Sequence, residues 1–514
     1  RERLDIKLQI EAFLSDIFKK AIRLVEEGGF LKPKMQNING GIEYNLKEKE
    51  CHGLKELITL LTFLYDDSKE CLILDEPELH LHPQFQSFFL SEIRKLSGNP
   101  KENSSKKIFF LITHSPYFLD LKTVEDLKSV FVFQGNRPPS YVDSLDAQDE
   151  YILKKFLPRF NTHHKQFFFS SNPVFVEGYT DQQLITMIYE KLGKDIGSSG
   201  SCIIDVGGKD ELAVFFRLCM KLDINPIIIA DLDALFKGKL RECLCENTNS
   251  NLYIQNEGIG ESLSAEIGEL EIKLKTLADD LIAKTSTDID VTRLIEHLKT
   301  YVVDGKIDNV EQFRFSMLLG LFRFKEMIEN VVSENKRPTI NFILGRIQNI
   351  FKAAKKCNMY FIPIGELEHY YTQTSIDYLN ITNKDVAFHA ERDFILKIEK
   401  NEIESRYSGL ISTLEDVVPV LNVDLFAHLR YELIEWSQRV QAAVERGEVK
   451  HIEQLKHNAR VNYKLYSQIL EITDFVINES DSTFKCKFKL ASKLSDSGSE
   501  LEISEKTTAH SFQI

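Results

Sequence analysis

Short apolar runs that end in acidic residues or glycine alternate with helical patterns along most of the chain. The first group comprises "CLILDE" at 71–76, "KKIFFLITHS" at 106–115 and "SVFVFQG" at 129–135. A second group comprises "PVFVEG", "SCIIDVGG", "INPIIIADLD" and "MYFIPIGELE". Buried parallel strands have this pattern, with polar groups at their carboxyl ends. The pattern therefore predicts an α/β protein with two sets of strands.

Helical spacing of apolar residues predicts helices around these strands. One such segment covers residues 4–27, a short strand follows at "GIEYNL", and a long helix begins after Gly53. The gap between "INPIIIADLD" and "MYFIPIGELE" is mostly helical and too long for one crossover helix, so we expect a helical insertion. After about residue 375 the pattern is helical to about 475, and the alternating "STFKCKFKLASKL" predicts a terminal hairpin.

Length and composition indicate a soluble globular protein of several domains. The chain has 514 residues, of which 43% are hydrophobic and 28% charged. We find no apolar run near the roughly 20 residues of a membrane helix and no signal peptide. Eight scattered cysteines favour reduced thiols and a cytoplasmic location. Because the first residue is arginine, we expect the sequence to begin inside a longer protein.

The net charge of −14 argues against a protein that coats nucleic acid. It leaves open an enzyme that binds DNA through a local basic groove, with metal ions offsetting its own carboxylates. A metal-dependent nuclease is therefore compatible with the charge.

The apolar run at 71–74 leads directly into two acids, as in the magnesium site of an ATPase. Asp75 would bind magnesium through a water or serine, and Glu76 would orient the attacking water. His114 follows the next strand, where it can contact a γ-phosphate. Gly53 lies at a helix N-terminus, where free N–H groups favour phosphate. Each feature alone is common, so the inference depends on their order and spacing.

A nucleotide site of this kind also needs a phosphate loop, and G-x-x-x-x-G-K-[ST] does not occur in the sequence. The order of the remaining elements resembles the ABC-type ATPases related to SMC and RecF proteins. The resemblance implies the second half of an ATP-binding head, with the phosphate loop N-terminal to these residues. It also implies a dimer or higher oligomer, because two heads sandwich ATP. Cys51 stands where the signature usually has serine, which leaves the strength of the contact across the dimer open.

The second set of strands carries a different group of acids. Glu177 and Asp181 lie four residues apart after one strand, a Gly207–Gly208 turn follows the next, and Asp231 and Asp233 follow a third. The D-x-D spacing on an extended segment directs both carboxylates to one side. Mg²⁺ prefers such oxygen ligands, and two ions can clamp both oxygens of a phosphodiester that is being cleaved. A D-x-D or E-G motif alone is weak evidence for a metal site, whereas all of these features together, each after its own strand, are stronger evidence.

This set resembles the TOPRIM domain of topoisomerases, primases and some nucleases. An SMC-like ATPase head followed by TOPRIM resembles the OLD (overcoming lysogenization defect) family of ATP-dependent endonucleases, and the Gabija nuclease subunit and some retron effectors are similar. The match covers about residues 45–370 and includes a helical insertion.

The resemblance implies a role for each acid. Glu177, Asp231 and Asp233 would form one site for Mg²⁺ or Mn²⁺, and Asp181 and Glu368 would contribute to a second. Many relatives have glutamate in place of Asp181, so the shorter side chain could loosen the second metal.

The other candidates are less specific. "IPIGELEHYY" supplies Glu366 and Glu368, of which we favour Glu368. A basic residue should stabilise the pentavalent phosphate, and Lys237 is our candidate, with Lys209 the weaker one. The alternative for Lys237 is an ordinary exposed lysine.

The predicted fold is therefore α/β: the C-terminal part of an ABC-type ATPase head, then a Rossmann-like TOPRIM domain with a helical insertion. The expected parts are 1–135 (ATPase), 136–171 (connector), 172–259 (TOPRIM, first part), 260–355 (insertion), 356–375 (TOPRIM, last part) and 376–514 (mostly helical).

The leading hypothesis is an ATP-regulated, metal-dependent DNA endonuclease, with the ATPase head gating access or setting the oligomer state. The resemblance implies bacterial defence against phage, with partner proteins or a retron RNA–DNA. One alternative, a topoisomerase or primase relative, is disfavoured because we recognise no catalytic-tyrosine domain and no primase zinc motif. The other is a non-catalytic SMC-like scaffold or sensor, against which five carboxylates at strand ends argue.

Overall fold

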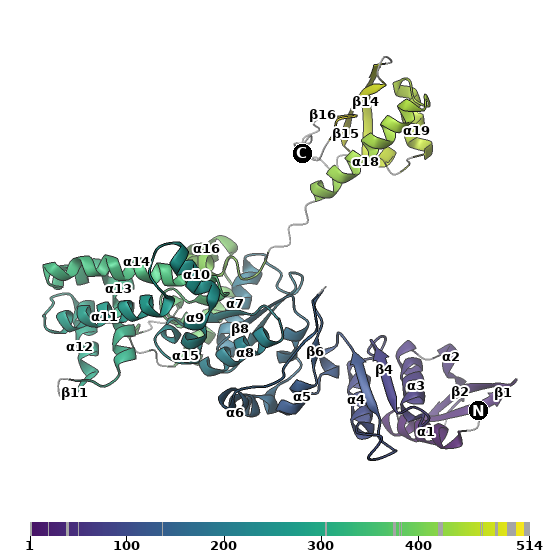
Figure 1. The fold of residues 1–514 in the computed structure, drawn as a ribbon, viewed down its shortest axis with the longest axis horizontal. Coiled ribbons are helices and arrows are strands. Elements are labelled where there is room, and N and C mark those ends of the chain that lie inside the picture. Colours follow the sequence, from purple (N-terminus) through teal and green to yellow (C-terminus); the bar gives the residue numbers. More distant parts are fainter. Residues whose placement is uncertain are drawn as a thin grey trace. The chain divides into compact units, whose positions relative to one another are not determined.

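The computed structural model describes residues 3–18, 20–37, 41–49, 51–135, 137–303, 306–373, 377–379, 381, 383–419, 425–462, 464, 466–478, 482–490 and 500–507. The chain divides into two compact units, Arg1–Val420 and Leu421–Ile514, which we describe separately (Figure 1). No helix among these residues is long and apolar enough to cross a membrane.

The N-terminal segment is a helix and a hairpin. Helix α1 (Leu4–Phe18) is followed by strand β1 (Lys20–Glu27), which pairs antiparallel with β2 (Phe30–Asn37). The prediction of a helical segment over 4–27 is therefore wrong after Phe18. The reason is the Gly28–Gly29 turn: both glycines have positive φ, at 62° and 78°, as a two-residue hairpin turn requires. Short elements β3 (Tyr44–Asn45) and α2 (Leu46–Lys49) complete this segment.

The part expected to be an ATPase head has two parallel strands with helices packed on one face. Strand β4 (Cys71–Asp75) pairs with β5 (Ile108–Ile112), so that Asp75 lies opposite Ile112. Helices α3 (His52–Tyr65) and α4 (Pro83–Leu96) contribute the core on one side, which includes Leu57, Leu61, Phe89 and Ile93. Alternate residues of the strands are exposed on the other side, with Ile73 at 67% and Phe110 at 56%.

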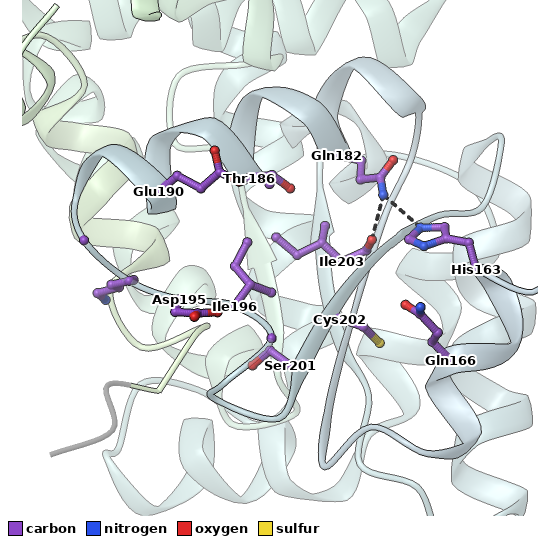
Figure 2. Close-up of a pocket in the computed structure, with 13 residues that line it drawn as sticks. His163, Gln166, Gln182, Thr186, Glu190, Asp195, Ile196, Ser201, Cys202 and Ile203 are labelled. Carbon is purple, nitrogen blue, oxygen red and sulfur yellow. Dashed lines mark hydrogen bonds between the residues drawn. The ribbon is translucent and has the colours of Figure 1, made fainter. Parts of the chain in front are cut away.

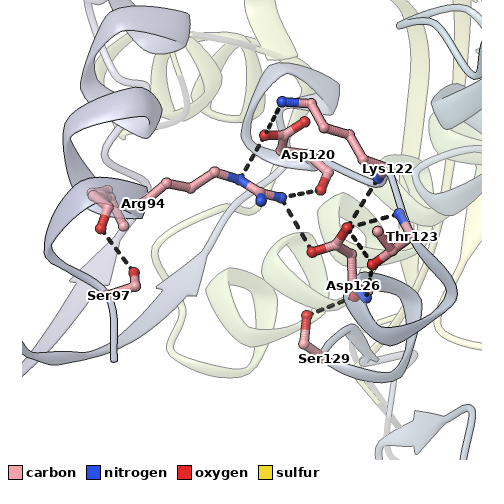
Figure 3. A network of polar contacts seen from close by, with 8 residues as sticks. Arg94, Ser97, Asp120, Lys122, Thr123, Asp126 and Ser129 are labelled. Atoms are coloured by element: carbon pink, nitrogen blue, oxygen red, sulfur yellow. Dashed lines mark hydrogen bonds and ion pairs between the residues drawn. The ribbon is translucent and has the colours of Figure 1, made fainter. Parts of the chain in front are cut away.

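Charged contacts join α4 to the segment that follows β5 (Figure 3). Arg94 Nε lies 2.6 Å from Asp120 Oδ2, and its Nη2 lies 3.3 Å from Asp126 Oδ1. Asp126 also closes a capping box with Thr123 at the start of α5 (Val124–Lys128). This segment begins with η1 (Pro116–Phe118), before α5, and ends with β6 (Phe131–Val132). The connector predicted over 136–171 contains β7 (Ser140–Tyr141), α6 (Ala147–Phe156), η2 (Leu157–Arg159) and η3 (His164–Phe168).

Four parallel strands form the central sheet of the second part. They are β8 (Asn172–Val176), β9 (Ser201–Asp205), β10 (Ile227–Ala230) and β13 (Met359–Phe361), in the order β13-β10-β8-β9. Helices α7 (Tyr179–Lys191) and α8 (Lys209–Lys221) pack on opposite faces. Alternate strand residues divide between the two cores, since Val174 and Val176 face α7 whereas Phe175 faces α8. The predicted Rossmann-like sheet is confirmed.

Strand β9 lies at the edge of this sheet, and no further strand pairs with its outer side among the described residues. A side chain contacts that side instead. Gln182 Nε2 donates to Ile203 O at 3.0 Å and lies 2.8 Å from His163 Nε2 (Figure 2). A hollow of about 680 Å³ lies beside this contact, and none of the acids predicted for chemistry lines it. Edge strands covered in this way are protected from pairing with other chains.

The predicted helical insertion separates β10 from β13. Three elements lie between β10 and residue 260, where the insertion was predicted to begin: η4 (Leu232–Leu235), α9 (Lys239–Glu246) and α10 (Thr248–Asn256). The predicted insertion over 260–355 contains α11 (Leu263–Ile282), α12 (Ile289–Thr300), β11 (Val302–Val303), β12 (Lys306–Ile307), α13 (Val310–Val331), η5 (Glu334–Lys336) and α14 (Arg337–Lys355). Helix α13 is kinked at Phe324, where the backbone leaves helical geometry.

The C-terminal region, predicted as one part over 376–514, divides between the two units. After η6 (Leu367–Tyr370), helices α15 (Lys384–Ile395), α16 (Lys400–Arg406) and α17 (Ser408–Leu414) share the core of α7. The second unit contains α18 (Leu425–Glu445), α19 (Ile452–Asn462), α20 (Tyr466–Ile469) and the antiparallel strands β14 (Leu470–Asn478), β15 (Thr483–Leu490) and β16 (Glu500–Ser504). The alternating stretch at 482–494 supplies β15, and its hairpin partner is β14.

Candidate active site

The acids and histidine predicted for nucleotide chemistry lie at adjacent strand ends of the ATPase part. Asp75 ends β4, and the next residue, Glu76, has a φ of 45° and donates its N–H to Ile112 O at 2.8 Å. His114 follows β5, and its Nε2 lies 3.9 Å from Glu76 Oε1. The N–H of His114 donates to Glu78 Oε1 at 2.7 Å, which holds the two loops together.

Gly53 contacts the same region from the first turn of α3. It is buried, and a Cβ at this position would lie 2.4 Å from His80 O, in the loop after β4. A side chain here would therefore displace either the helix or the loop. The structure brings Gly53 close to the segment that carries Glu76.

The carboxyl ends of the central strands gather a second set of acids. Glu177 follows β8 directly, and Asp231 follows β10. Asp181 lies in the first turn of α7 and accepts a hydrogen bond from the Gly178 N–H at 3.0 Å. Glu177, Asp181 and Asp231 line a cavity of about 10 Å³, together with apolar residues of α7, β10 and η6. The predicted acids of two strands and one helix thus share one small site.

The remaining acids lie on short 3-10 helices at the same edge. Asp233 is in η4, and Glu366 and Glu368 are in or beside η6. The N–H of Leu232 donates to Gly365 O at 2.9 Å, which ties the two loops together. Glu368 is buried, in contrast to an ordinary surface acid.

Three of the acids, Glu177, Asp181 and Asp231, resist ionisation. Burial, with Asp181 and Asp233 nearby, raises the pKa of Glu177 to about 7. Burial and then Glu368 raise the pKa of Asp181 to about 6. Burial, Asp181 and Glu177 hold the pKa of Asp231 well above its usual range. Carboxyl groups so close together cannot all ionise without a compensating positive charge.

The donor chemistry of this edge fits a hard divalent cation. Among the described residues, Glu177 Oε2 and Asp233 Oδ1 are buried without a hydrogen-bond partner. Carboxylate oxygens are the ligands that Mg²⁺ and Mn²⁺ take in proteins. No three His, Cys, Asp or Glu side chains in the described part of the chain already have the spacing of a metal shell. These acids therefore fit a divalent cation in three respects: their residue type, their charge and their unpaired oxygens.

Two lysines supply positive charge to the acids. Lys209, the first residue of α8, forms an ion pair with Asp233. Lys384, the first residue of α15, lies 2.6 Å from Glu366 Oε2 and 3.3 Å from Glu368 Oε1. Although burial opposes their charge, the nearby carboxylates raise the pKa of both lysines.

Lys237, in contrast, is exposed, and no ion pair of it is found among the described residues. Sequence reasoning ranked Lys209 below Lys237 and missed Lys384. The Gly-Gly turn before Lys209 was a usable signal. Lys384 follows no apolar strand, so the pattern contained nothing that pointed to it.

Hydrogen bonds outside the acid set fix the η6 segment. Glu391 of α15 accepts the N–H groups of Thr372 and Gln373 at 2.8 and 3.0 Å, and also the hydroxyl of Tyr407. Arg323, at the kink of α13, donates to His369 O at 3.0 Å. The insertion and α15 therefore both hold the loop that carries Glu368.

Comparisons with known proteins agree with these two sites. Residues 2–119 match the model of an AAA ATPase domain, and residues 168–233 match the TOPRIM domain of proteins like the overcoming lysogenization defect protein. Domains of these kinds generally use a nucleotide and a divalent metal.

Three curated proteins are similar to the chain. An OLD nuclease from Thermus scotoductus is 30% identical over 32% of this chain and 30% of its own length. The Old nuclease of Escherichia phage P2 is 24% identical over 56% of this chain and 48% of its own. Endonuclease GajA of Bacillus cereus is 24% identical over 53% and 40%. The chain thus spans less than half the length of each of these relatives. The chain contains an AAA ATPase domain followed by an OLD-like TOPRIM domain, and it is similar to nucleases of the OLD family.

Proposed function

We propose that this protein is a metal-dependent DNA endonuclease regulated by ATP. The observation that carries the proposal is the group of carboxylates at one edge of the central sheet. Glu177, Asp181 and Asp231 surround one small cavity, two oxygens of the group are buried and unpaired, and two lysines face it. The nuclease names of three similar proteins support the same chemistry.

Each acid has an assigned role in this proposal. Glu177, Asp231 and Asp233 hold one Mg²⁺ or Mn²⁺, and Asp181 and Glu368 hold a second. When bound, such ions polarise a phosphodiester and lower the pKa of water. The protons on Glu177 and Asp181 near neutral pH must leave as the carboxylates bind a cation, so binding strengthens as the pH rises.

Lys384 takes the role that the sequence assigned to Lys237. Its ammonium group lies at the edge of the acid set, at the carboxylate that would hold the second ion. There it can stabilise the extra negative charge that a phosphodiester acquires when it is attacked. Lys209, paired with Asp233, restrains that carboxylate.

The ATPase part supplies regulation. Asp75 and Glu76 would bind magnesium and orient water, His114 would contact the γ-phosphate, and Gly53 lets α3 approach the same loop. The head would gate DNA access or set the state of a homo-oligomer, through which the nuclease serves defence against phage with a protein or retron RNA–DNA partner.

A cleavage assay tests the proposal. Supercoiled and linear DNA are incubated with the protein in Mg²⁺ or Mn²⁺ or in chelator, each with and without ATP. We expect metal-dependent cutting that Asp231→Ala/Asp233→Ala abolishes, and the ATP arms give the sign of regulation. If the wild type and this variant act alike in every arm, the acids do not cleave DNA and a non-catalytic scaffold is the better account.

A further inference from the structure

Arg159 lies against the Gly207–Gly208 turn, beside the acid set. It is the last residue of η2, and a Cβ on Gly207 would lie 3.0, 3.3 and 3.3 Å from its Nη2, Cζ and Nη1. The face of the guanidinium therefore lies over the backbone of the turn, which has room for it because Gly207 has no side chain. The N–H of Gly207 donates to Glu177 O at 2.9 Å, so the arginine lies next to the segment that carries the first acid.

Buried rings hold Arg159 in this place. Phe156 and Phe160, on either side of it in the chain, are 2% and 9% exposed. They pack on Phe215 of α8, with ring centroids 5.1 and 6.2 Å apart. The guanidinium carbon also lies 4.9 Å from the centroid of the Phe156 ring. Because α8 begins with Lys209, which pairs with one of the acids, these rings fix the arginine relative to the acid set.

The guanidinium keeps donors that the protein does not use. The side chain is 55% exposed, and the ion pair found for it among the described residues joins Nη2 to Glu211 Oε1 at 3.4 Å. An exposed pair of this kind contributes little to stability. No hydrogen bond from Nε or Nη1 to a described residue is found. The planar group can therefore bind a phosphate with two parallel hydrogen bonds.

The order of the strands places this arginine beside the acids but not among them. The turn follows β9, while Glu177 follows the neighbouring strand β8 and Asp231 follows β10, one strand further. At about 4.8 Å between neighbouring strands, the turn lies ~5 Å from the end of β8 and ~10 Å from the end of β10. Lys384 pairs with Glu368 in the segment after β13, at the other end of the strand order. A DNA strand that crosses this edge would meet a cation on each side of the acids.

We propose that Arg159 binds a backbone phosphate of the DNA, next to the phosphodiester that is cleaved. The inference rests on the proposed function, because it takes the acid set as the site of cleavage. The acids outnumber the two lysines that face them, so the edge repels DNA unless further positive charge is present. A cation that contacts a phosphate that is not attacked contributes to DNA binding rather than to the chemical step.

The test compares Arg159→Ala with Arg137→Ala in the full protein. Arg137 is the matched control, because its side chain is 65% exposed and pairs with one carboxylate, that of Asp223, after the far end of α8. Binding of a fluorescent DNA duplex is measured by anisotropy at several salt concentrations, in Ca²⁺, which takes oxygen ligands as Mg²⁺ does. We expect Arg159→Ala to weaken DNA binding about 10-fold at low salt and to lower the slope of log Kd against log salt by about 1. Arg137→Ala should change the Kd less than about 2-fold.

A third variant, Glu211→Gln, separates DNA binding from a structural role of the ion pair. If Arg159 acted only through Glu211, this variant would weaken DNA binding as Arg159→Ala does. We expect no weakening, because the substitution removes a negative charge beside the bound phosphate. All three variants should melt within about 2 °C of the wild type, which excludes misfolding as the cause of a loss.

Two results would overturn the inference alone, provided that the wild type binds DNA. One is an unchanged Kd and salt slope for Arg159→Ala, and the other is an equal loss of affinity in Arg159→Ala and Glu211→Gln. A wild type that binds no DNA at any salt concentration overturns the proposed function, and the inference with it.

Discussion

Replacing Glu177 by glutamine should stabilise the metal-free protein at high pH and leave it unchanged at low pH. Burial and two neighbouring acids raise the pKa of Glu177 from 4.5 to about 7, so the folded state binds this proton more tightly than the unfolded chain. The stability that this proton contributes is complete below pH 4.5 and is lost as the pH rises through about 7. A glutamine, which cannot ionise, avoids that loss.

The size of the effect follows from the two pKa values. They differ by about 2.5, and at about 1.4 kcal/mol for each unit of pKa the ceiling is ~3.5 kcal/mol. Glu177 is only half-buried, and solvent screening reduces this to about 1–3 kcal/mol. For a unit of this length, that corresponds to a rise of about 1–3 °C in the melting temperature.

The assay is thermal unfolding in chelator near pH 5 and near pH 8. Glu190→Gln, at the exposed far end of α7, is the matched control and should show no pH-dependent difference. In saturating Mn²⁺ the sign should reverse for Glu177→Gln, because a ligand has been removed. Equal effects of Glu177→Gln at both pH values, or destabilisation near pH 8 in chelator, would refute the assignment of a buried proton to Glu177.

Three further substitutions test other contacts. Lys384→Met should slow DNA cleavage about 100-fold while Lys237→Met changes it less than about 2-fold, and equal effects would contradict the assignment of Lys384. Gly53→Ala should lower the free energy of unfolding, measured with denaturant, by about 1–3 kcal/mol, because the new Cβ would lie 2.4 Å from His80 O. An unchanged free energy of unfolding would exclude that close approach. Gly365 has a φ of 94°, and a Cβ at this position would lie 2.6 Å from a Leu319 methyl carbon. Gly365→Ala should therefore displace the loop of Glu368 and weaken Mn²⁺ binding, and unchanged binding would refute this coupling.

The sequence predicted the central sheet because buried parallel strands have a simple pattern. The apolar runs in "PVFVEG" and "IIIADLD" end where the strands end. The sequence alone therefore predicted that Glu177, Asp231 and Asp233 lie at one edge of the central sheet. The same logic failed at residues 20–27, because apolar spacing over a short segment fits helix or strand, and the Gly28–Gly29 turn decided the outcome.

Contacts between distant segments could not be predicted. Lys384 lies 207 positions from Glu177 in the sequence, and only the packing of α15 on α7 brings it to the acids. Glu391 and Arg323 belong to helices with ordinary amphipathic patterns, so nothing local indicated that they hold η6.

The central claim is that the carboxylates at the edge of the TOPRIM sheet cleave DNA with a bound metal. The most direct measurement is the initial rate of nicking of supercoiled DNA in Mn²⁺ by Asp231→Ala and by Asp223→Ala, an exposed aspartate paired with Arg137. The account predicts a rate at background for the first and a rate within about 2-fold of wild type for the second. Undiminished nicking by Asp231→Ala would contradict it.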